Sequence, residues 1–313
     1  MGERVTDLSA RVGSVVLPNP VMTASGTAGH GTELAAYLDL GGLGAVVVKS
    51  LAAFPWAGNP APRLHPAGEG MLNSVGLQGP GVEAWLADVL PALLATGARV
   101  VASIWGRTVE EFAAAAAALA AAPAGVVAVE VNVSCPNLED RRRMFAHSPS
   151  ATRDALAATA ACGRPRWAKL SPNAADLAEV AAAAREGGAE AVTLVNTLLG
   201  MAIDPDTRRP RLGGGGGGLS GPPLRPVALR AVWDVHAALP DLPIVGVGGV
   251  ARAEHAVELL LAGASAVQVG TATFADPRAP AAVLDGLRHW CATRGVTHLG
   301  ELVGQAHAGR ERP

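Results

Sequence analysis

The chain has 313 residues, of which 50% are hydrophobic and 17% are charged, and its formal net charge is −2. This apolar content and length exclude an intrinsically disordered chain and predict a protein with a large buried core. The balance of 25 basic against 27 acidic residues lacks the basic excess typical of nucleic-acid-binding domains, so we expect no nucleic-acid partner.

Three cysteines, Cys135, Cys162 and Cys291, are too few and too widely spaced for a disulfide scaffold, a zinc ribbon or an iron–sulfur cluster. The acidic N-terminus does not resemble a secretory signal. The most apolar run, Phe112–Val129, is mostly alanine and predicts a helix followed by a strand rather than a membrane span. We therefore expect a cytoplasmic protein with no membrane partner.

Short apolar runs alternate along the chain with alanine-rich stretches of helical length. The runs are hydrophobic almost throughout, which is typical of parallel strands covered on both faces. We predict strands at Val21–Ala24, Ala45–Lys49, Arg99–Ile104, Val126–Asn132, Arg166–Leu170, Ala191–Asn196, Pro243–Val247 and Ala266–Val269. We predict helices at Val82–Leu94, Val109–Ala121, Thr152–Ala161, Ala175–Glu186, Val227–Leu239, Glu254–Leu261 and Ala281–Thr293.

Eight strand–helix units predict an α/β protein with a (β/α)₈ TIM barrel, formed by residues 1–313 as a single domain. A doubly wound open sheet is the alternative, although it usually has fewer strands. Before the first strand, Arg11–Val16 predicts a small β-hairpin that closes the floor of the barrel.

Two connections, Ser50–Gly81 and Thr197–Pro226, are too long to be simple turns, and such long loops are usually functional or disordered. Both are expected at the C-terminal face of the barrel. The second contains six consecutive glycines, Gly213–Gly218, which we interpret as a flexible segment or a lid hinge. It is not a phosphate-binding loop, because no Lys-Ser or Lys-Thr pair follows it.

Of the 25 basic residues only two are lysines, Lys49 and Lys169, and both end apolar strands. We expect them at positions where a guanidinium does not fit, although a buried lysine can also serve only to pair with a carboxylate. The one acidic residue inside a predicted strand near such an end is Glu130. Paired carboxylates and His–carboxylate clusters are missing from the strand ends, which argues against a glycosidase, a serine hydrolase and a metal site.

Catalytic groups of a TIM barrel lie at the carboxyl ends of its strands. Here these ends carry serines, asparagines, the two lysines and one cysteine, Cys135, for which a chemical role competes with that of a small buried hydrophobe. Glycines end the seventh and eighth strands, at Gly248, Gly249 and Gly270, where barrel enzymes commonly bind a phosphate group.

Seven motifs, in order, carry a resemblance to a known family. They are Gly58-Asn59-Pro60, the run from Asn73 to Gln78, the run from Asn132 to Asn137, the run from Lys169 to Asn173, Asn196-Thr197, the run from Gly200 to Asp204, and the run from Gly217 to Gly221. With these motifs the chain resembles class 1 dihydroorotate dehydrogenases, which are FMN-dependent barrel enzymes of pyrimidine biosynthesis.

The resemblance implies that the chain oxidises (S)-dihydroorotate to orotate by hydride transfer to FMN, with Cys135 as the general base and Lys49 as a second catalytic residue. It implies FMN-binding residues Ala24, Ser25, Lys49, Ser50, Asn132, Lys169, Val195, Gly221, Gly248, Gly249, Gly270 and Thr271. It implies substrate-binding residues Lys49, Asn73, Val75, Gly76, Leu77, Asn132, Asn137, Asn196 and Thr197.

Gln78 is more similar to the NAD-linked subclass, class 1B, in which a second subunit carries FAD and an iron–sulfur cluster. A homodimer or a heterotetramer is then expected. The chain departs from the family at Gly79, at Glu139 and in the loop 138–147. A flavin barrel acting on another dihydropyrimidine, a Schiff-base lysine aldolase or lyase, and a non-catalytic flavin-binding subunit therefore stay open as alternatives.

Overall fold

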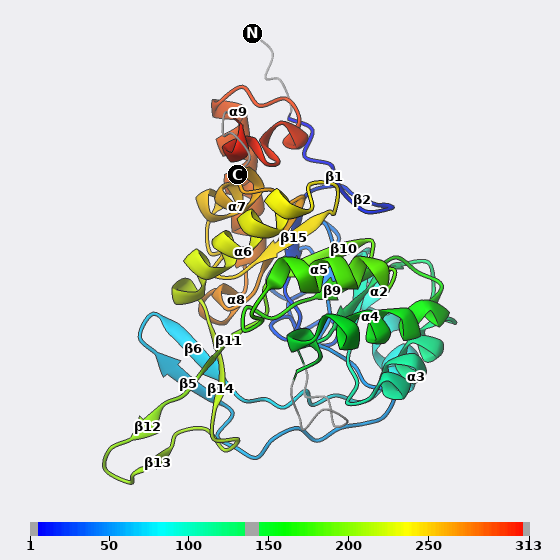
Figure 1. Cartoon of the computed structure of the whole chain (residues 1–313). Coiled ribbons are helices and arrows are strands. Elements are labelled where there is room, and N and C mark those ends of the chain that lie inside the picture. The colour runs from blue at the N-terminus through cyan, green and yellow to red at the C-terminus, as the bar shows by residue number, and fades with distance from the viewer. Residues whose placement is uncertain (1–5, 135–143, 309–313) are drawn as a thin grey trace.

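A parallel sheet of eight strands forms the centre of the computed structural model, which describes residues 6–134 and 144–308. The strand order is β3-β16-β15-β10-β9-β8-β7-β4, and an isolated parallel bridge between Met22 and Ala45 joins the two ends of this sheet into a barrel. Helices lie between the strands and cover the outside of the barrel (Figure 1). The predicted (β/α)₈ barrel is confirmed.

All eight predicted barrel strands are present. β8 and β16 begin and end where the sequence predicts, and the other six are one to three residues shorter. The strands are β3 Val21–Thr23, β4 Val46–Val47, β7 Val100–Ile104, β8 Val126–Asn132, β9 Arg166–Lys169, β10 Ala191–Leu194, β15 Ile244–Val247 and β16 Ala266–Val269. Most of their side chains are buried, because the barrel interior covers one face and the helices cover the other.

Three of the outer helices begin at side-chain caps. The Thr108 side chain accepts the Glu111 backbone N–H at the start of α3, and Asp176 accepts the Glu179 N–H at the start of α5, which satisfies amides left free in the first turn. The helices are α3 Val109–Leu119, α4 Pro149–Ala158, α5 Leu177–Glu186, α6 Arg225–Ala238, α7 Ala253–Leu261 and α9 Ala279–Thr293. A short α8, Ala272–Ala275, follows β16 and was not predicted.

The predicted helix Val82–Leu94 is not continuous. It consists of α1 Val82–Ala84, a π-helical turn over Trp85–Val89 and α2 Leu90–Ala95. Pro91 lies in the first turn of α2, and its ring nitrogen has no hydrogen to donate to the preceding turn. The missing hydrogen bond explains why the regular helix is interrupted there.

The predicted N-terminal hairpin is formed by β1 Ala10–Val12 and β2 Val15–Leu17. The backbone N–H of Ser14 in its turn donates to the Glu190 carboxylate at 2.8 Å, and Glu190 directly precedes β10. The hairpin therefore lies at the amino ends of the barrel strands, on the floor of the barrel.

A second sheet lies beyond the carboxyl ends of the barrel strands, and the sequence did not predict it. It is antiparallel in the order β11-β14-β6-β5, with the small hairpin β12–β13 projecting from it (Figure 1). Its strands are β5 Leu64–Ala67, β6 Gly70–Asn73, β11 Leu198–Gly200 and β14 Gly217–Ser220, and the hairpin is Ile203–Asp204 with Arg209–Pro210. We call the four-stranded sheet β11-β14-β6-β5 the extension sheet.

The extension sheet corrects our interpretation of the glycine run. Gly217 and Gly218 belong to β14, where Gly218 lies between Leu199 of β11 and Asn73 of β6. A Cβ atom on Gly218 would overlap the Thr197 hydroxyl. The last two glycines of the run thus belong to a strand that needs glycine for close packing, not to the hinge that we expected.

Candidate active site

A cavity at the carboxyl ends of the barrel strands brings the predicted site residues together. Each residue of the implied FMN and substrate sets that the structure describes lines this one cavity. They are Ala24, Ser25, Lys49, Ser50, Asn73, Val75, Gly76, Leu77, Asn132, Lys169, Val195, Asn196, Thr197, Gly221, Gly248, Gly249, Gly270 and Thr271. The remaining two, Cys135 and Asn137, lie outside the described residues.

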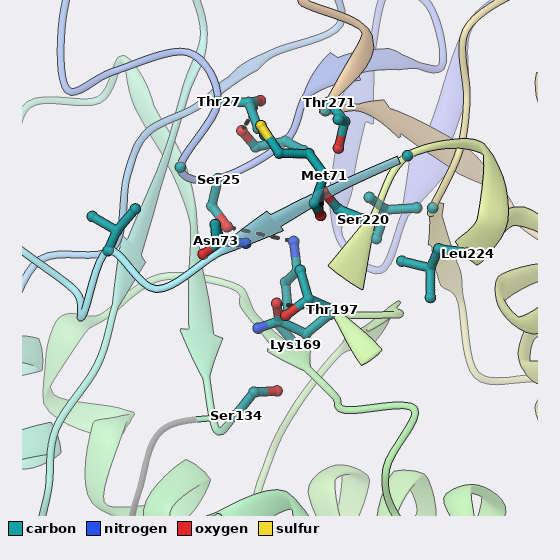
Figure 2. Close-up of a pocket in the computed structure, with 18 of the residues that line it drawn as sticks. Ser25, Thr27, Met71, Asn73, Ser134, Lys169, Thr197, Ser220, Leu224 and Thr271 are labelled. Atoms are coloured by element: carbon teal, nitrogen blue, oxygen red, sulfur yellow. Dashed lines mark hydrogen bonds between the residues drawn. The ribbon is translucent and has the colours of Figure 1, made fainter. Parts of the chain in front are cut away.

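Both lysines of the chain line this cavity. The Lys169 ammonium donates to Ser25 Oγ at 3.4 Å and to Gln268 Oε1 at 3.3 Å, and its Nζ lies 3.8 Å from a carboxylate oxygen of Glu130. Figure 2 shows the Lys169 side chain reaching towards Ser25. The expectation that a buried lysine can pair with a carboxylate therefore holds for Lys169.

Lys49 has a different environment. Burial lowers the pKa of its ammonium below the ordinary value, and the positive charge of Arg63 lowers it further. Within the part of the chain that the structure describes, no carboxylate forms an ion pair with Lys49. Lys49 is therefore a half-buried cation that an anionic ligand would stabilise.

Three amide side chains are held in fixed orientations beside the lysines. Asn132 Oδ1 accepts from Asn196 Nδ2 at 3.1 Å, and Asn132 Nδ2 donates to Ser50 Oγ at 3.3 Å. Asn73 Nδ2 donates to the Gly218 carbonyl at 3.3 Å. Since these contacts fix which edge of each amide faces the cavity, the site can distinguish donors from acceptors on a ring with imide or carboxylate edges.

One corner of the cavity consists of glycine backbone. Gly221, Gly248 and Gly249 have positive φ angles of 88°, 140° and 68°. A Cβ on Gly248 would lie 2.6 Å from the Ala228 Cβ, and one on Gly249 would lie 2.6 Å from the Arg225 Cβ. Only glycine suits these positions, and the exposed backbone beside the first turn of α6 suits a phosphate group.

The segment that follows β6 also lines the cavity, and its backbone is constrained. Gly76 and Leu77 have positive φ angles of 73° and 61°, and the second is unusual for a residue with a side chain. Trp56 braces the segment, since its indole N–H donates to the Gly76 carbonyl at 3.0 Å and its backbone pairs with Gly79. The strained backbone is thus held in one shape towards the cavity.

Nine cavity residues were not predicted, although Ser134 and Ser220 belong to motifs that we had noted. Leu64 and Met71 come from strands of the extension sheet that gave no recognisable pattern in the sequence. The unpredicted residues are Gly26, Thr27, Leu64, Met71, Ser134, Ser220, Leu224, Val247 and Phe274.

The described part of the chain also bears on metal binding, membrane spans and the two cysteines Cys162 and Cys291. Residues 6–134 and 144–308 contain no cluster of three or more His, Cys, Asp or Glu side chains arranged to bind a metal ion. In the same ranges, no helix has the length and apolar character that crossing a membrane requires. Cys162 and Cys291 are buried free thiols, and burial raises the pKa of Cys291.

Comparison with known proteins agrees with the geometry of the cavity. The family model "Dihydroorotate dehydrogenase" matches residues 7–290. The chain is 48% identical over 297 residues to the dihydroorotate dehydrogenase B (NAD(+)) catalytic subunit of Desulforudis audaxviator, covering 95% of this chain and 96% of that protein. The proteins of the same name from Trichlorobacter lovleyi and Geotalea daltonii are 45% and 44% identical, with 95% of this chain and 97% of each relative covered. The chain belongs to the dihydroorotate dehydrogenase family and is most similar to its NAD-linked class, as Gln78 had indicated.

Proposed function

We propose that this member of the dihydroorotate dehydrogenase family oxidises (S)-dihydroorotate to orotate with bound FMN, as the catalytic subunit of a larger complex. The observation that carries the proposal is the single cavity lined by every described residue of the implied FMN and substrate sets. The relatives named above are catalytic subunits of dihydroorotate dehydrogenase B (NAD(+)), which supports the same activity here.

The residues of the cavity fit FMN. The glycine corner at Gly221, Gly248 and Gly249 would hold the phosphate through backbone N–H groups, because side chains there would collide with their neighbours. Lys169 would place its ammonium at the ring system, where a positive charge stabilises the electron-rich reduced form. Bound FMN would supply the hydride acceptor.

The substrate would lie between the ring system and the Asn73–Leu77 segment. Lys49 and the oriented amides of Asn132 and Asn196 would bind its carboxylate and imide edges. Cys135, which lies outside the described residues, would remove the proton from C5 as a thiolate. A positioned base next to a bound ring removes the need for a base from solvent.

A second subunit is part of the proposal. The sequence has three cysteines, which cannot hold an iron–sulfur cluster, so electrons from the flavin need another chain to reach NAD. The words "catalytic subunit" in the names of the relatives are consistent with such a partner, carrying FAD and an iron–sulfur cluster. The assembly would be a homodimer of this chain or a heterotetramer with the partner.

The test is anaerobic reduction of the purified protein. Denaturation should release FMN, and dihydroorotate should bleach the visible absorbance of the bound flavin. Dihydrouracil, which lacks the carboxylate, should bleach it far more slowly because it leaves Lys49 without an anion. A colourless protein that FMN does not reconstitute would overturn the proposal, and faster bleaching by another dihydropyrimidine would reassign the substrate.

Cys135→Ala tests the assignment of the base. We expect flavin bleaching by dihydroorotate to slow by about 10²-fold or more, because a positioned base contributes about that much. FMN content should stay unchanged, and Cys135→Ser should keep part of the rate with an optimum at higher pH. If Cys135→Ala bleaches as fast as the wild type, another group is the base.

The lowered pKa of Lys49 is also what a Schiff-base lysine would need. If Lys49 formed a Schiff base, borohydride reduction in the presence of a carbonyl substrate would attach that substrate covalently to Lys49. We expect no such adduct, because the family is one of oxidoreductases.

A further inference from the structure

Glu130 is a fully buried carboxylate in the barrel interior, and the proposed reaction does not use it. It lies in β8, two residues before Asn132, and its exposed fraction is 0%. Barrel interiors are normally filled by branched apolar side chains, and an unpaired buried carboxylate is strongly destabilising. Its presence below the cavity therefore needs a reason beyond packing.

Three neighbours surround this carboxylate. Glu130 Oε2 accepts from Gln268 Nε2 of β16 at 2.8 Å and from Thr193 Oγ1 of β10 at 3.2 Å. Glu130 Oε1 has no hydrogen-bond partner among the described residues and lies 3.8 Å from Lys169 Nζ. Gln268 links both sides of the arrangement, because its Oε1 also accepts from Lys169 Nζ at 3.3 Å. We call these four residues the Glu130 network.

The network defines where its two charges lie. Two neutral donors hold one oxygen of Glu130, and the other oxygen lies beside Lys169, which is only 4% exposed. Thr193 and Lys169 are paired neighbours in adjacent strands, so the sheet itself sets the spacing of the network. Lys169 lines the cavity, whereas Glu130 is not among its lining residues.

A purely structural role does not account for this arrangement. Replacing a buried ion pair by apolar residues of similar size is often neutral or stabilising, so the pair is a weak source of stability. The four polar side chains of the network instead hold the cationic side chain of Lys169 in a fixed place at the base of the cavity.

We infer that Glu130 is a positioning residue that holds the Lys169 side chain directed at the flavin ring, so that the site binds reduced FMN more tightly relative to oxidised FMN. The inference rests on the proposed FMN site. Gln268 and Thr193 act with Glu130 by holding its carboxylate in place.

The test uses Glu130→Gln, which removes the charge and keeps the shape. Because the chain has only two lysines, ¹³C-lysine labelling gives two side-chain Cε signals, and Lys49→Arg identifies which one is Lys169. At neutral pH we expect the Lys169 Cε signal to move between the wild type and Glu130→Gln, because the carboxylate beside Nζ is removed. Together with this change, the affinity for reduced relative to oxidised FMN should fall by about tenfold, since a misdirected Lys169 loses its charge-assisted hydrogen bond to the reduced ring.

A compensating variant separates charge from packing. Glu130→Gln combined with Gln268→Glu exchanges the two side chains and returns one carboxylate to hydrogen-bond distance of Lys169. We expect it to restore most of the wild-type FMN affinity ratio. If Glu130→Gln does not fold, Thr193→Val removes a single hydrogen bond from Glu130 and should shift the affinity ratio in the same direction by a smaller factor.

The outcomes distinguish this inference from the proposed function. Wild-type protein that binds no FMN overturns both. If the wild-type protein binds FMN, and both the Lys169 Cε signal and the FMN affinity ratio are unchanged in Glu130→Gln or Thr193→Val, the role of Glu130 alone is overturned. A folded exchange variant without recovery of the affinity ratio would also contradict it, because a carboxylate is again beside Lys169 in that variant.

Discussion

The two lysines of this chain lie in one cavity but in opposite electrostatic environments. Lys169 faces the buried carboxylate of Glu130 at 3.8 Å, within a network that fixes both charges. Burial and the positive charge of Arg63 both disfavour the ammonium form of Lys49 and lower its pKa. Among the described residues, Lys169 thus has an acidic partner in the protein, whereas the charge of Lys49 is left for a ligand to neutralise.

This difference shows how one residue type can serve two purposes. A lysine paired with an internal acid keeps its charge whether or not a substrate is present, which suits a group that must favour an electron-rich cofactor. A lysine without a partner binds an anion strongly because binding relieves its own burial. The predictions that follow test whether the two lysines differ in this way.

The largest expected effect is on stability. Lys169→Met leaves Glu130 buried without a cation, and breaking a buried pair in this way costs about 3–5 kcal/mol. Lys49→Met removes a half-buried charge that pairs with no carboxylate among the described residues, and it should leave the free energy of unfolding unchanged or slightly higher. Urea unfolding of both variants measures the difference, and Lys169→Met combined with Glu130→Gln should recover most of the loss. Equal stability of Lys169→Met and Lys49→Met would contradict the proposed difference between the two lysines.

The next effect is on turnover. Lys49→Met should slow flavin bleaching by dihydroorotate about 10²-fold, which is typical of removing one donor to a developing negative charge. FMN content should not change, because the glycine corner that would hold the phosphate is untouched. Stopped-flow measurement over a range of dihydroorotate concentrations checks this, and a variant as fast as the wild type would remove Lys49 from the reaction.

A third prediction concerns the glycine run, which lies on the substrate side of the cavity. Gly218→Ala would push a methyl group into the Thr197 hydroxyl, whereas Gly216→Ala meets only ordinary contacts. We expect Gly218→Ala to raise the Kd for orotate by about tenfold, since overpacking costs about 1–3 kcal/mol. Gly216→Ala is the matched control with wild-type affinity. The ratio of affinities for reduced and oxidised FMN should not change in either variant.

The smallest effect is the pH dependence of stability. The pKa of Lys49 is lower in the folded protein than its ordinary value of 10.5, so between these two values the unfolded chain binds more protons. Stability should therefore rise with pH in that alkaline window, by at most about 1.4 kcal/mol per pH unit. Thermal unfolding of wild type and Lys49→Met across the window measures this. The same rise in both proteins would assign it to another group.

The barrel was predictable from the sequence because its strands are covered on both faces. That environment selects uninterrupted apolar runs such as Val126–Asn132, which is β8 without a change of boundary. The strand-end polar residues were found for the same reason, since a lysine or asparagine at the end of such a run is conspicuous.

The extension sheet was not predictable in the same way. β14 contains two adjacent glycines, β5 contains Pro66, and both strands are only partly buried, so neither has a clear alternation of polar and apolar residues. Their pairing joins segments far apart in the chain, such as Gly218 and Asn73. A contact of that kind leaves no local signal.

The Glu130 network was only partly visible in the sequence. Glu130 stood out as an acid inside a strand, but its partners Thr193 and Gln268 come from strands that begin about 60 and 140 residues later along the chain, and pairing them depends on strand register. Both partners lie inside ordinary apolar runs. Barrel closure, which the sequence does not encode locally, brings them together.

The most direct test of this account is anaerobic bleaching of the bound flavin by dihydroorotate in wild type, Lys49→Met and Lys169→Met, measured side by side. We predict fast and complete bleaching in the wild type, slow bleaching in Lys49→Met, and bleaching to a smaller final extent in Lys169→Met because reduced FMN is held less tightly. A wild-type protein whose flavin dihydroorotate does not bleach would contradict the proposed function. Identical rates and extents in all three proteins would contradict the division of roles between the two lysines.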